Sequence, residues 1–412
     1  MPQWFRLEVS LACLLCFTAA LGCARAPQSL PADAASAVDG AAPALDGPAA
    51  GPDLAMASEV RPRPEVPIVD QAGQEAILGD PTAPPGSPVG IHGQLQVDGT
   101  LLKDAAGNLV QLKGVSSMWL NWESKPFAES ASALQYMRDY WKLSVLRASM
   151  GTDASKGYLT SATNQAAMQA KVETIIQNAI RLGVYVIVDW HTEKAVDQQA
   201  AAIAFFTALA TKYGSYPNVI WEPYNEPHNY TWAQIKAYHE AVVDAIRAVD
   251  PDNLIVMGTA NWSQDVDVAS RDPVQPQSGT RNLMYTLHFY ACTHQLQYRL
   301  KGDIAIAAGL ALFVTEFGAT PSDGGVVSKG DPYVCRDETN VWWDWMSLNN
   351  VSGVSWKLDQ CTDTSCILTA AAPVDGPWTD DLLTTDANNT PVKEGVTQGG
   401  GHGLFIVDWL RE

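Results

Sequence analysis

Residues 219–227 read Val-Ile-Trp-Glu-Pro-Tyr-Asn-Glu-Pro, an apolar run that ends on Asn225 and Glu226. Residues 312–318, Leu-Phe-Val-Thr-Glu-Phe-Gly, place Glu316 where a second apolar run stops. Carboxylates at two strand ends indicate paired-carboxylate chemistry. The glutamates are 90 positions apart in the chain, so only the fold can bring them together. An eight-stranded β/α barrel can do this, because every parallel strand delivers its C-terminal end to one rim.

The chain from Ile91 onward alternates apolar strands with amphipathic helices, the pattern of a parallel sheet wrapped by helices. Eight strands are predicted, at residues 111–116, 144–148, 184–189, 219–223, 254–258, 283–288, 312–315 and 351–356. Helices are predicted at residues 164–182, 200–213, 232–249, 338–348 and 404–410. The predicted fold class is α/β, with a single (β/α)8 TIM barrel formed by residues 89–412.

Composition limits the partners of the chain. Its 412 residues carry a formal net charge of -19, which disfavours nucleic acid and anionic membrane surfaces as partners. A neutral substrate fits this charge better. The chain has 14 Trp, and flat aromatic faces hold the apolar faces of sugar rings, although most buried Trp serve packing.

The N-terminal region is expected to lie outside the barrel. Residues 1–23 have Arg6 and a mostly apolar run at 11–21, which predicts a secretory signal peptide. The stretch Ala20-Leu21-Gly22-Cys23 resembles a bacterial lipoprotein box, so a lipid anchor through Cys23 is one expectation and ordinary cleavage nearby is the other. Residues 24–88 carry 12 of the 25 Pro and no Phe, Trp or Tyr, which predicts a disordered linker rich in Pro and Ala. We therefore expect a secreted or cell-surface protein.

Four cysteines follow the predicted signal segment. In an exported chain they are expected to form disulfides, and four cysteines allow three pairings. The close pair Cys361 and Cys366 can close a small loop, which would leave Cys292 with Cys335. Free thiols are the alternative.

Polar and aromatic residues gather at the predicted strand ends. They are Arg147, Asp189, His191, Asn225, Glu226, His288, Tyr290, Glu316 and Trp356. Each alone has an ordinary structural explanation, but their meeting on one rim indicates an active site. Two facing carboxyls can cleave a glycosidic bond, one as the acid and the other as the nucleophile. Tyr290 could donate a hydrogen bond to Glu316, and Asn225 could bind the sugar hydroxyl beside the reacting carbon.

In this ordered set of motifs the chain resembles glycoside hydrolase family 5, close to its bacterial endo-1,4-β-glucanases. The resemblance covers about residues 91–360. Its motifs are His92-Gly93, Lys113-Gly114-Val115-Ser116-Ser117, Val145-Leu146-Arg147-Ala148, Val188-Asp189-Trp190-His191, Asn225-Glu226-Pro227, Trp262-Ser263-Gln264-Asp265-Val266, Leu287-His288-Phe289-Tyr290, Thr315-Glu316-Phe317-Gly318 and Ser355-Trp356.

The resemblance implies a role for each site residue. Glu226 matches the acid/base and Glu316 the nucleophile of a retaining, two-glutamate double displacement that needs no cofactor or metal. The other positions match substrate-binding and supporting residues: Arg147 and Tyr290 beside Glu316, Asn225 at the sugar 2-hydroxyl, His191 and His288 around the cleaved bond, Trp356 under the glycone sugar, Trp122 as a further stacking residue and Trp262 as a candidate wall of the leaving-group side. The implied substrate is a β-1,4-glucan polysaccharide.

One departure keeps alternatives open. Relatives have His-Gly after the paired Ser, where this chain has Met118-Trp119, so a hydrogen-bonding group is missing on the glycone side. The same mechanism on β-mannan, xylan, chitosan or mixed-linkage glucan is one alternative, and a surface carbohydrate-binding protein without catalysis is another. Metal hydrolysis and serine hydrolysis are disfavoured, because neither His-Glu-x-x-His nor Gly-x-Ser-x-Gly occurs. The sequence predicts no oligomeric state.

Overall fold

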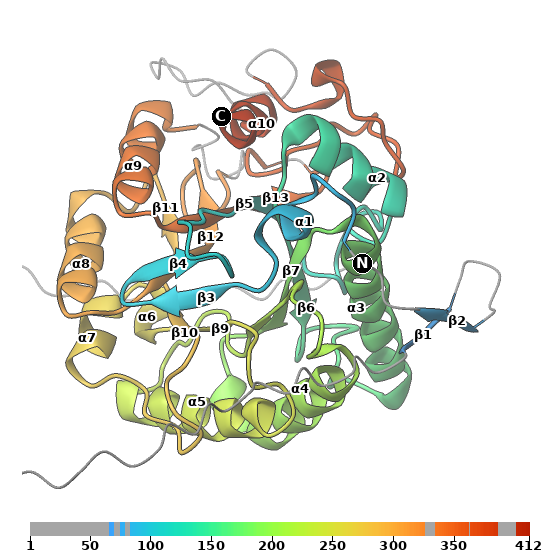
Figure 1. Cartoon of the computed structure of the whole chain (residues 1–412). Helices are drawn as coiled ribbons and strands as arrows, with labels where there is room; N and C mark the ends of the chain where they lie inside the picture. The colour runs from blue at the N-terminus through green and yellow to red at the C-terminus, as the bar shows by residue number, and fades with distance from the viewer. Residues whose placement is uncertain (1–65, 70–74, 79–82, 326–333, 362, 386–400) are drawn as a thin grey trace, which may run out of the picture. The chain divides into compact units, whose positions relative to one another are not determined.

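Eight parallel strands close into a barrel in the computed structural model of the chain, which describes residues 66–69, 75–78, 83–325, 334–361, 363–385 and 401–412 (Figure 1). The strands are β5 (Lys113–Ser117), β6 (Val145–Gly151), β7 (Tyr185–His191), β8 (Val219–Glu222), β9 (Ile255–Met257), β10 (Leu283–Thr286), β12 (Leu312–Gly318) and β13 (Ser352–Leu358). Neighbours in this list pair in parallel, and β13 pairs with β5 to close the ring. The TIM-barrel prediction is confirmed, with all eight strands at the predicted places.

Helices follow the strands around the outside of the barrel. They are α2 (Ala131–Tyr136), α3 (Ala162–Leu182), α4 (Gln199–Tyr213), α5 (Trp232–Arg247), α6 (Ala260–Ser263), α7 (Val266–Arg271), α8 (Leu296–Ala307), α9 (Arg336–Leu348) and α10 (Gly403–Arg411). Local signals set several ends: Ser161 caps α3 by accepting from the Asn164 amide, and Gly183 ends it with a left-handed φ of 66°. Among the described residues, no helix is both long and apolar enough to cross a membrane.

The interior of the barrel is apolar toward the N-terminal ends of the strands. A cluster of buried side chains fills it, including Tyr185, Ile187, Ile220, Val256, Met284, Phe313 and Val354. Neighbouring strand residues such as Val219 and Trp221 belong instead to the larger core between the strands and the helices. Because side chains alternate along a strand, Glu222 points to the same side as Ile220, into the barrel. This alternation carries polar side chains to the upper part of the interior.

The continuous stretch of described residues begins at residue 83, before the predicted barrel boundary at residue 89. Ser87 is buried and caps α1 (Pro88–His92), and the Val89 amide donates to the Gly183 carbonyl. Within the predicted linker, β1 (Val66–Val69) and β2 (Glu75–Leu78) also form an antiparallel pair. The predicted signal peptide, Cys23 and most of the linker lie outside the described residues.

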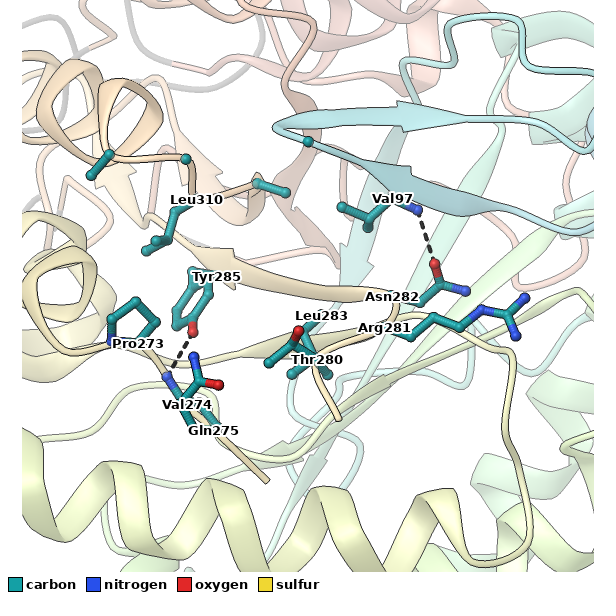
Figure 2. A pocket seen from close by; sticks show the side chains of 14 residues that line it. Val97, Pro273, Val274, Gln275, Thr280, Arg281, Asn282, Leu283, Tyr285 and Leu310 are labelled. Atoms are coloured by element: carbon teal, nitrogen blue, oxygen red, sulfur yellow. Dashed lines mark hydrogen bonds between the residues drawn. The ribbon is translucent and has the colours of Figure 1, made fainter. Parts of the chain in front are cut away.

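An antiparallel hairpin of β3 (Gln96–Asp98) and β4 (Leu101–Lys103) precedes the barrel. The amide of Val97 on this hairpin donates to the Asn282 side chain just before β10, beside a hollow of about 560 Å³ (Figure 2). The hollow is lined by the hairpin, by residues between 273 and 285 around the start of β10 and by residues 308–311 before β12, and none of the predicted site residues lies there.

Two disulfides cross-link loops of the barrel, Cys292 to Cys335 and Cys361 to Cys366. This is the pairing that the sequence favoured, so it is confirmed. The short strand β11 (Phe289–Tyr290) was not predicted separately; it pairs with the end of β12 and sets the place of Tyr290 on the rim.

Candidate active site

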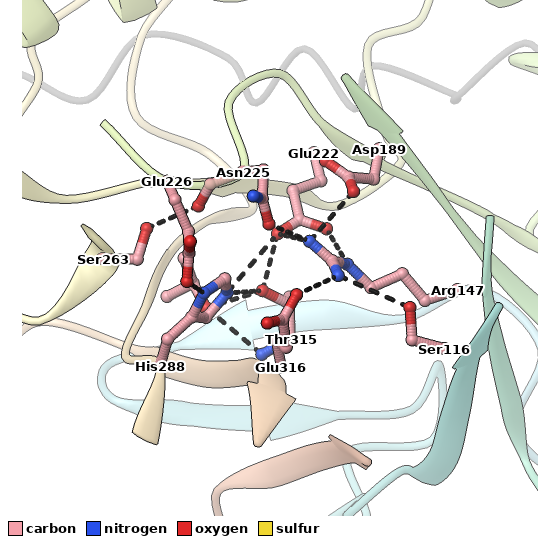
Figure 3. A network of polar contacts seen from close by, with 12 residues as sticks. Ser116, Arg147, Asp189, Glu222, Asn225, Glu226, Ser263, His288, Thr315 and Glu316 are labelled. Carbon is pink, nitrogen blue, oxygen red and sulfur yellow. Dashed lines mark hydrogen bonds and ion pairs between the residues drawn. The ribbon is translucent and has the colours of Figure 1, made fainter. Parts of the chain in front are cut away.

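Arg147, on β6, is the centre of a buried polar network inside the rim of the barrel (Figure 3). Its Nε and Nη2 donate to the two carboxyl oxygens of Glu222 at 2.7 and 3.2 Å. Nη2 also lies 2.9 Å from Asp189 and donates to the Asn225 side chain at 2.6 Å, while Nη1 donates to Glu316 at 2.8 Å. One guanidinium therefore fixes groups from β7, β8, the loop after β8 and β12.

Charge in this network is set by burial and by the single guanidinium. Burial alone would lower the pKa of Arg147, but the carboxylates of Asp189, Glu222 and Glu316 raise it above its ordinary value. Burial raises the pKa values of Asp189 and Glu222, and Arg147 opposes that rise. The cluster therefore holds protons more tightly than the same groups would in water.

Glu316 has both carboxyl oxygens occupied by donors. Oε2 accepts from Arg147 and Oε1 accepts from the Tyr290 hydroxyl at 2.6 Å. The register of β12 against β13 shifts between Val314 and Phe317, so the ladder is irregular at this residue. Such an irregularity re-aims side chains, which explains how Thr315 and Glu316 can both reach the polar network. Two strong hydrogen bonds therefore fix the position and orientation of the Glu316 carboxyl.

Glu226 lies across the pocket from Glu316. A carboxyl oxygen of each residue and a ring nitrogen of His288 all lie within 4.8 Å of one another. The Glu226 side chain is 20% exposed, and its Oε1 lies 3.0 Å from His288 Nδ1. Burial among protein atoms raises the pKa of Glu226 to about 8, and the charge of Glu193 adds to the rise. Glu226 therefore keeps its proton to a higher pH than an exposed carboxyl would.

The same three groups, Glu226, His288 and Glu316, are close enough to ligate a metal ion. Glu316 already accepts from Arg147 and Tyr290, however, and these bonds favour acid and base chemistry at the pair. The second such group, Cys361, Asp363 and Cys366, has its two sulfurs joined in a disulfide.

A turn of unusual conformation holds the backbone on both sides of Glu226. Asn261, Trp262 and Ser263 in α6 have consecutive φ values of 58°, 55° and 56°, in the left-handed region. The Trp262 amide donates to the Pro227 carbonyl at 3.0 Å, and the Ser263 hydroxyl donates to the Asn225 carbonyl at 2.6 Å. Such strain persists only where surrounding contacts enforce it, and it is typical of functional sites.

A row of aromatic rings extends the site along one side. His191 stacks on Trp356 with ring centroids 5.6 Å apart, and its Nδ1 lies 2.6 Å from Asp189. Trp119 meets His191 edge-on at 4.4 Å and stacks on Trp122 at 4.7 Å with the planes 10° apart. Trp122 is 48% exposed, so one indole face is supported while the side chain is open to solvent.

The loop that carries Trp119 and Trp122 is held by hydrogen bonds to the segment after β13. Ser124 donates to the buried carboxyl of Asp359 after β13, and Lys125 donates to the Ala372 carbonyl at 3.0 Å. An exposed indole held in this way is a platform suited to the apolar face of a sugar ring.

The other side of Glu226 is a cavity of about 460 Å³. Its lining includes Glu193, Glu226, Trp262, Gln264, Tyr290, His294, Tyr298 and Glu316. Trp262 stacks on His228 at 3.7 Å and forms a wall there. The carboxyl pair therefore opens into this cavity, and the aromatic row adjoins the polar network through His191 and Asp189.

The structure brings the predicted site residues together. The bonded network contains Arg147, Asp189, Asn225, Glu226, His288, Tyr290 and Glu316, the aromatic row contains His191, Trp356 and Trp122, and Trp262 lines the cavity. The sequence analysis missed Glu222, Thr315, Glu193 and Trp119 as members of the site. A buried Glu at the end of Val-Ile-Trp-Glu was a signal for Glu222, since an unpaired acid would not end a core strand.

Comparisons with known proteins agree with this geometry. The family model of cellulases, glycosyl hydrolase family 5, matches residues 103–362. An endoglucanase of Clostridium saccharobutylicum is 40% identical over 298 residues, 71% of this chain and 63% of that protein. Endoglucanase Z of Dickeya dadantii is 42% identical over 275 residues, 66% of this chain and 60% of that protein. The chain thus spans about 60% of the length of these curated relatives.

Solved structures give the same result. A structure from Cytophaga hutchinsonii has a TM-score of 0.69 and 35% identity, covering 79% of this chain and 96% of that chain. The catalytic domain of a Thermobifida fusca endoglucanase, in complex with cellotetraose, has a TM-score of 0.68 and 28% identity, covering 79% and 100%.

Proposed function

Since the chain belongs to glycosyl hydrolase family 5, the cellulases, we propose that it is a retaining endo-1,4-β-glucanase with Glu316 as nucleophile and Glu226 as acid and base. The observation that carries the proposal is the carboxyl pair, whose nearest oxygens lie within 4.8 Å. Retaining enzymes hold their carboxyls about 5–5.5 Å apart, whereas inverting enzymes leave about 6.5–9.5 Å for a water molecule. The short separation supports direct attack by Glu316.

The reaction would proceed in two displacements. Glu316 attacks the anomeric carbon while Glu226 gives its proton to the glycosidic oxygen, so the aglycone leaves as an alcohol and a glycosyl ester remains. Glu226, now ionised, takes a proton from water as that water attacks the same carbon, which frees the sugar and restores both carboxyls. Arg147 and Tyr290 donate to Glu316 and hold its carboxyl in place for attack, and Arg147 also donates to the Asn225 side-chain oxygen, which leaves the Asn225 amide nitrogen to donate to the sugar hydroxyl.

The substrate class is proposed from the shape and chemistry of the cleft. Trp356, His191, Trp119 and Trp122 form an apolar row on one side of the carboxyls, and Trp262 forms a wall on the other. Such a cleft suits a β-1,4-linked chain, whose sugar rings present flat apolar faces. The aromatic row and the cavity beside the carboxyl pair together offer room for sugars on either side of the cleaved bond, which supports endo action.

A different polysaccharide is the second candidate, and Trp119 is the observation that favours it. Its ring lies on the glycone side, where the relatives that the sequence resembles have His-Gly in place of Met118-Trp119. This chain therefore offers fewer hydrogen bonds to the sugar hydroxyls on that side. β-Mannan or mixed-linkage glucan could then be accepted as well. A Met118→His, Trp119→Gly variant, which restores the pair of the relatives, should narrow the substrate range toward glucan; an unchanged range would contradict this view.

We also propose export of the protein to the cell surface or medium, with Cys23 as a site of lipid attachment. The two disulfides support an oxidising compartment. Mass spectrometry of the mature protein would test it: a diacylated Cys23 supports the anchor, and an unmodified N-terminus nearby supports ordinary cleavage.

The direct test is product analysis of the purified chain on carboxymethylcellulose, mixed-linkage β-glucan, mannan and xylan. Soluble oligosaccharides from the first two, absent with Glu316→Ala, are expected. The product anomer should initially be β, which proton NMR can follow. Release of the α-anomer would contradict retention, and no products from a folded, sugar-binding chain would favour the non-catalytic alternative.

A further inference from the structure

His288 is bonded through both of its ring nitrogens. Nδ1 lies 3.0 Å from Glu226 Oε1, and Nε2 lies 2.9 Å from Thr315 Oγ1. The ring is buried, and burial lowers the pKa of His288 to about 4, so it is neutral near pH 7. A neutral imidazole has one N–H, so one nitrogen donates and the other accepts. The question is which nitrogen carries the hydrogen.

Thr315 decides this, because a hydroxyl has only one hydrogen to give. Its Oγ1 lies 2.6 Å from Glu222 Oε1, and both oxygens of that carboxyl receive N–H groups of Arg147. Burial raises the pKa of Glu222 to about 7 and the bidentate guanidinium of Arg147 opposes that rise, so above neutral pH the carboxylate is ionised and can only accept. Thr315 therefore donates its hydrogen to Glu222.

Thr286 agrees with this direction. Its Oγ1 accepts from the Thr315 amide at 3.1 Å and lies 2.7 Å from Thr315 Oγ1, so its own hydrogen can point to Thr315. With its one hydrogen given to Glu222, Thr315 can only accept from His288. Nε2 of His288 thus carries the hydrogen, and Nδ1 presents a lone pair to Glu226.

A lone pair and a carboxylate oxygen 3.0 Å apart would repel each other, unless a proton lies between them. We propose that Thr315 is a positioning residue that fixes the tautomer of His288 and thereby keeps the proton on Glu226 in the resting state. This inference rests on the proposed role of Glu226 as the acid and base. It also means that His288 gives the Glu226 carboxylate no donor after the first displacement, which leaves Glu226 a stronger base for the second.

Other charged groups face Glu226 from the elements packed around it. Glu193 after β7, Asp189 on β7 and Glu222 on β8 disfavour its ionised form, and Arg147 on β6 favours it. Glu316 on β12 and Tyr290 on β11 lie across the pocket. All of these charged groups remain in every variant of Thr315. A difference in the pKa of Glu226 between these variants therefore reports the tautomer of His288.

The test compares Thr315→Val, which keeps the shape and removes the hydroxyl, with Thr315→Ser, which restores it. In the valine variant, Nε2 loses its acceptor, so the hydrogen can move to Nδ1 and bond to the Glu226 carboxylate. A donor to the ionised form lowers a pKa. In the pH profile of kcat/KM on cello-oligosaccharides, the activity lost at alkaline pH (the alkaline limb) reports the ionisation of Glu226. This limb should therefore move to lower pH by roughly one unit in Thr315→Val and return to its wild-type position in Thr315→Ser.

Two controls separate positioning from structure. Thr339→Val, at a buried threonine of α9 that donates to the Cys335 carbonyl, should leave the limb in place. An aryl cellobioside with a very good leaving group needs no proton from Glu226 in the first displacement. Under conditions where that displacement limits the rate, its alkaline limb should not shift with Thr315→Val. A uniform loss at every pH and with both substrates would overturn the proposal.

The tautomer can be measured without activity. Nitrogen-15 NMR of histidine-labelled wild-type protein, with His288 assigned by the His288→Gln variant, distinguishes a protonated Nε2 from a protonated Nδ1. A protonated Nε2 is expected near pH 7, and a protonated Nδ1 would overturn the inference even if Thr315→Val does not fold. Wild-type protein that cleaves no β-glycan would instead sink the proposed function, while the NMR result would still stand.

Discussion

The two halves of the barrel interior are built from the same strands and differ in almost every other respect. Toward the N-terminal ends, side chains such as Ile187 and Ile220 pack in an apolar cluster. Two residues further along the same strands, Asp189 and Glu222 lie buried around Arg147. A distance of two residues thus separates a core that stabilises the fold from a charge cluster that costs desolvation free energy.

This contrast separates two roles of the barrel interior, stability in the lower half and positioning of the site in the upper half. Burial of apolar surface in the lower half contributes stability that does not depend on pH. The upper half contributes geometry, since one guanidinium orients several acceptors, and its net effect on stability is small or unfavourable. Substitutions in the two halves should therefore separate activity from stability.

The largest effect is expected at the reacting carboxyl. Glu316→Gln should lower kcat on cello-oligosaccharides by roughly a thousandfold or more, because no nucleophile remains. Its melting temperature should change little, since the amide keeps the shape of the side chain. The matched control is Glu338→Gln on α9, whose carboxyl pairs with Arg299. A Glu316→Gln variant with near-normal turnover would remove Glu316 from the mechanism.

The next largest effect is on stability and lies at the centre of the upper half. Arg147→Met leaves three buried carboxyls without their counter-charge, which should lower the free energy of unfolding by about 3–5 kcal/mol. Urea unfolding measures this. Arg271→Met, which breaks an exposed pair with Asp267, should cost no more than about 1 kcal/mol. Equal costs for the two variants would mean that the buried network is not strongly coupled.

In the lower half, Ile220→Ala should cost about 2–4 kcal/mol of unfolding free energy through lost burial and a residual cavity. The folded variant should keep its KM and kcat, because the carboxyls are held by Arg147 and not by Ile220. Ile304→Ala, at a half-exposed position of α8, should cost only about 0.5 kcal/mol. A Ile220→Ala protein that is stable but inactive would contradict the division of the two halves.

The smallest effect concerns the edge of the upper half. The charge of Glu193 adds to the burial that raises the pKa of Glu226 to about 8. In Glu193→Gln that repulsion is absent, so the pKa of Glu226 falls and the protonated acid is lost at a lower pH. The alkaline limb of kcat/KM should move to lower pH, with Glu240→Gln on α5 as the control. An upward shift would mean that Glu193 does not act through its charge.

Much of this contrast could be predicted from the sequence. Apolar runs of the right length gave all eight strands, and the polar residues that end them gave the members of the rim. The resemblance to family 5 endoglucanases then assigned a role to each. These inferences succeed because alternation and strand polarity are local properties of the chain.

The features that the sequence did not reveal depend on contacts between distant segments. The shift in register at Thr315 and Glu316 arises from pairing between β12 and β13, and no local pattern marks it. The stack of Trp119 on Trp122 depends on a loop fixed by Ser124 and Asp359, which are 235 positions apart. The same limit applies to the segment just before residue 89, because Ser87 is buried where the neighbouring Val89 amide bonds to Gly183, far along the sequence.

The left-handed turn at Asn261, Trp262 and Ser263 has a consequence for protein engineering. Each such residue costs roughly 1–2 kcal/mol relative to a right-handed conformation, and glycine would relieve that cost. Glycine at 262 or 263 would also remove the indole wall or the hydroxyl that holds the Asn225 carbonyl. A search for more heat-resistant variants would therefore tend to select substitutions at these three residues. The same substitutions would weaken the contacts that hold the backbone on both sides of Glu226, so a gain in thermal stability here would reduce activity.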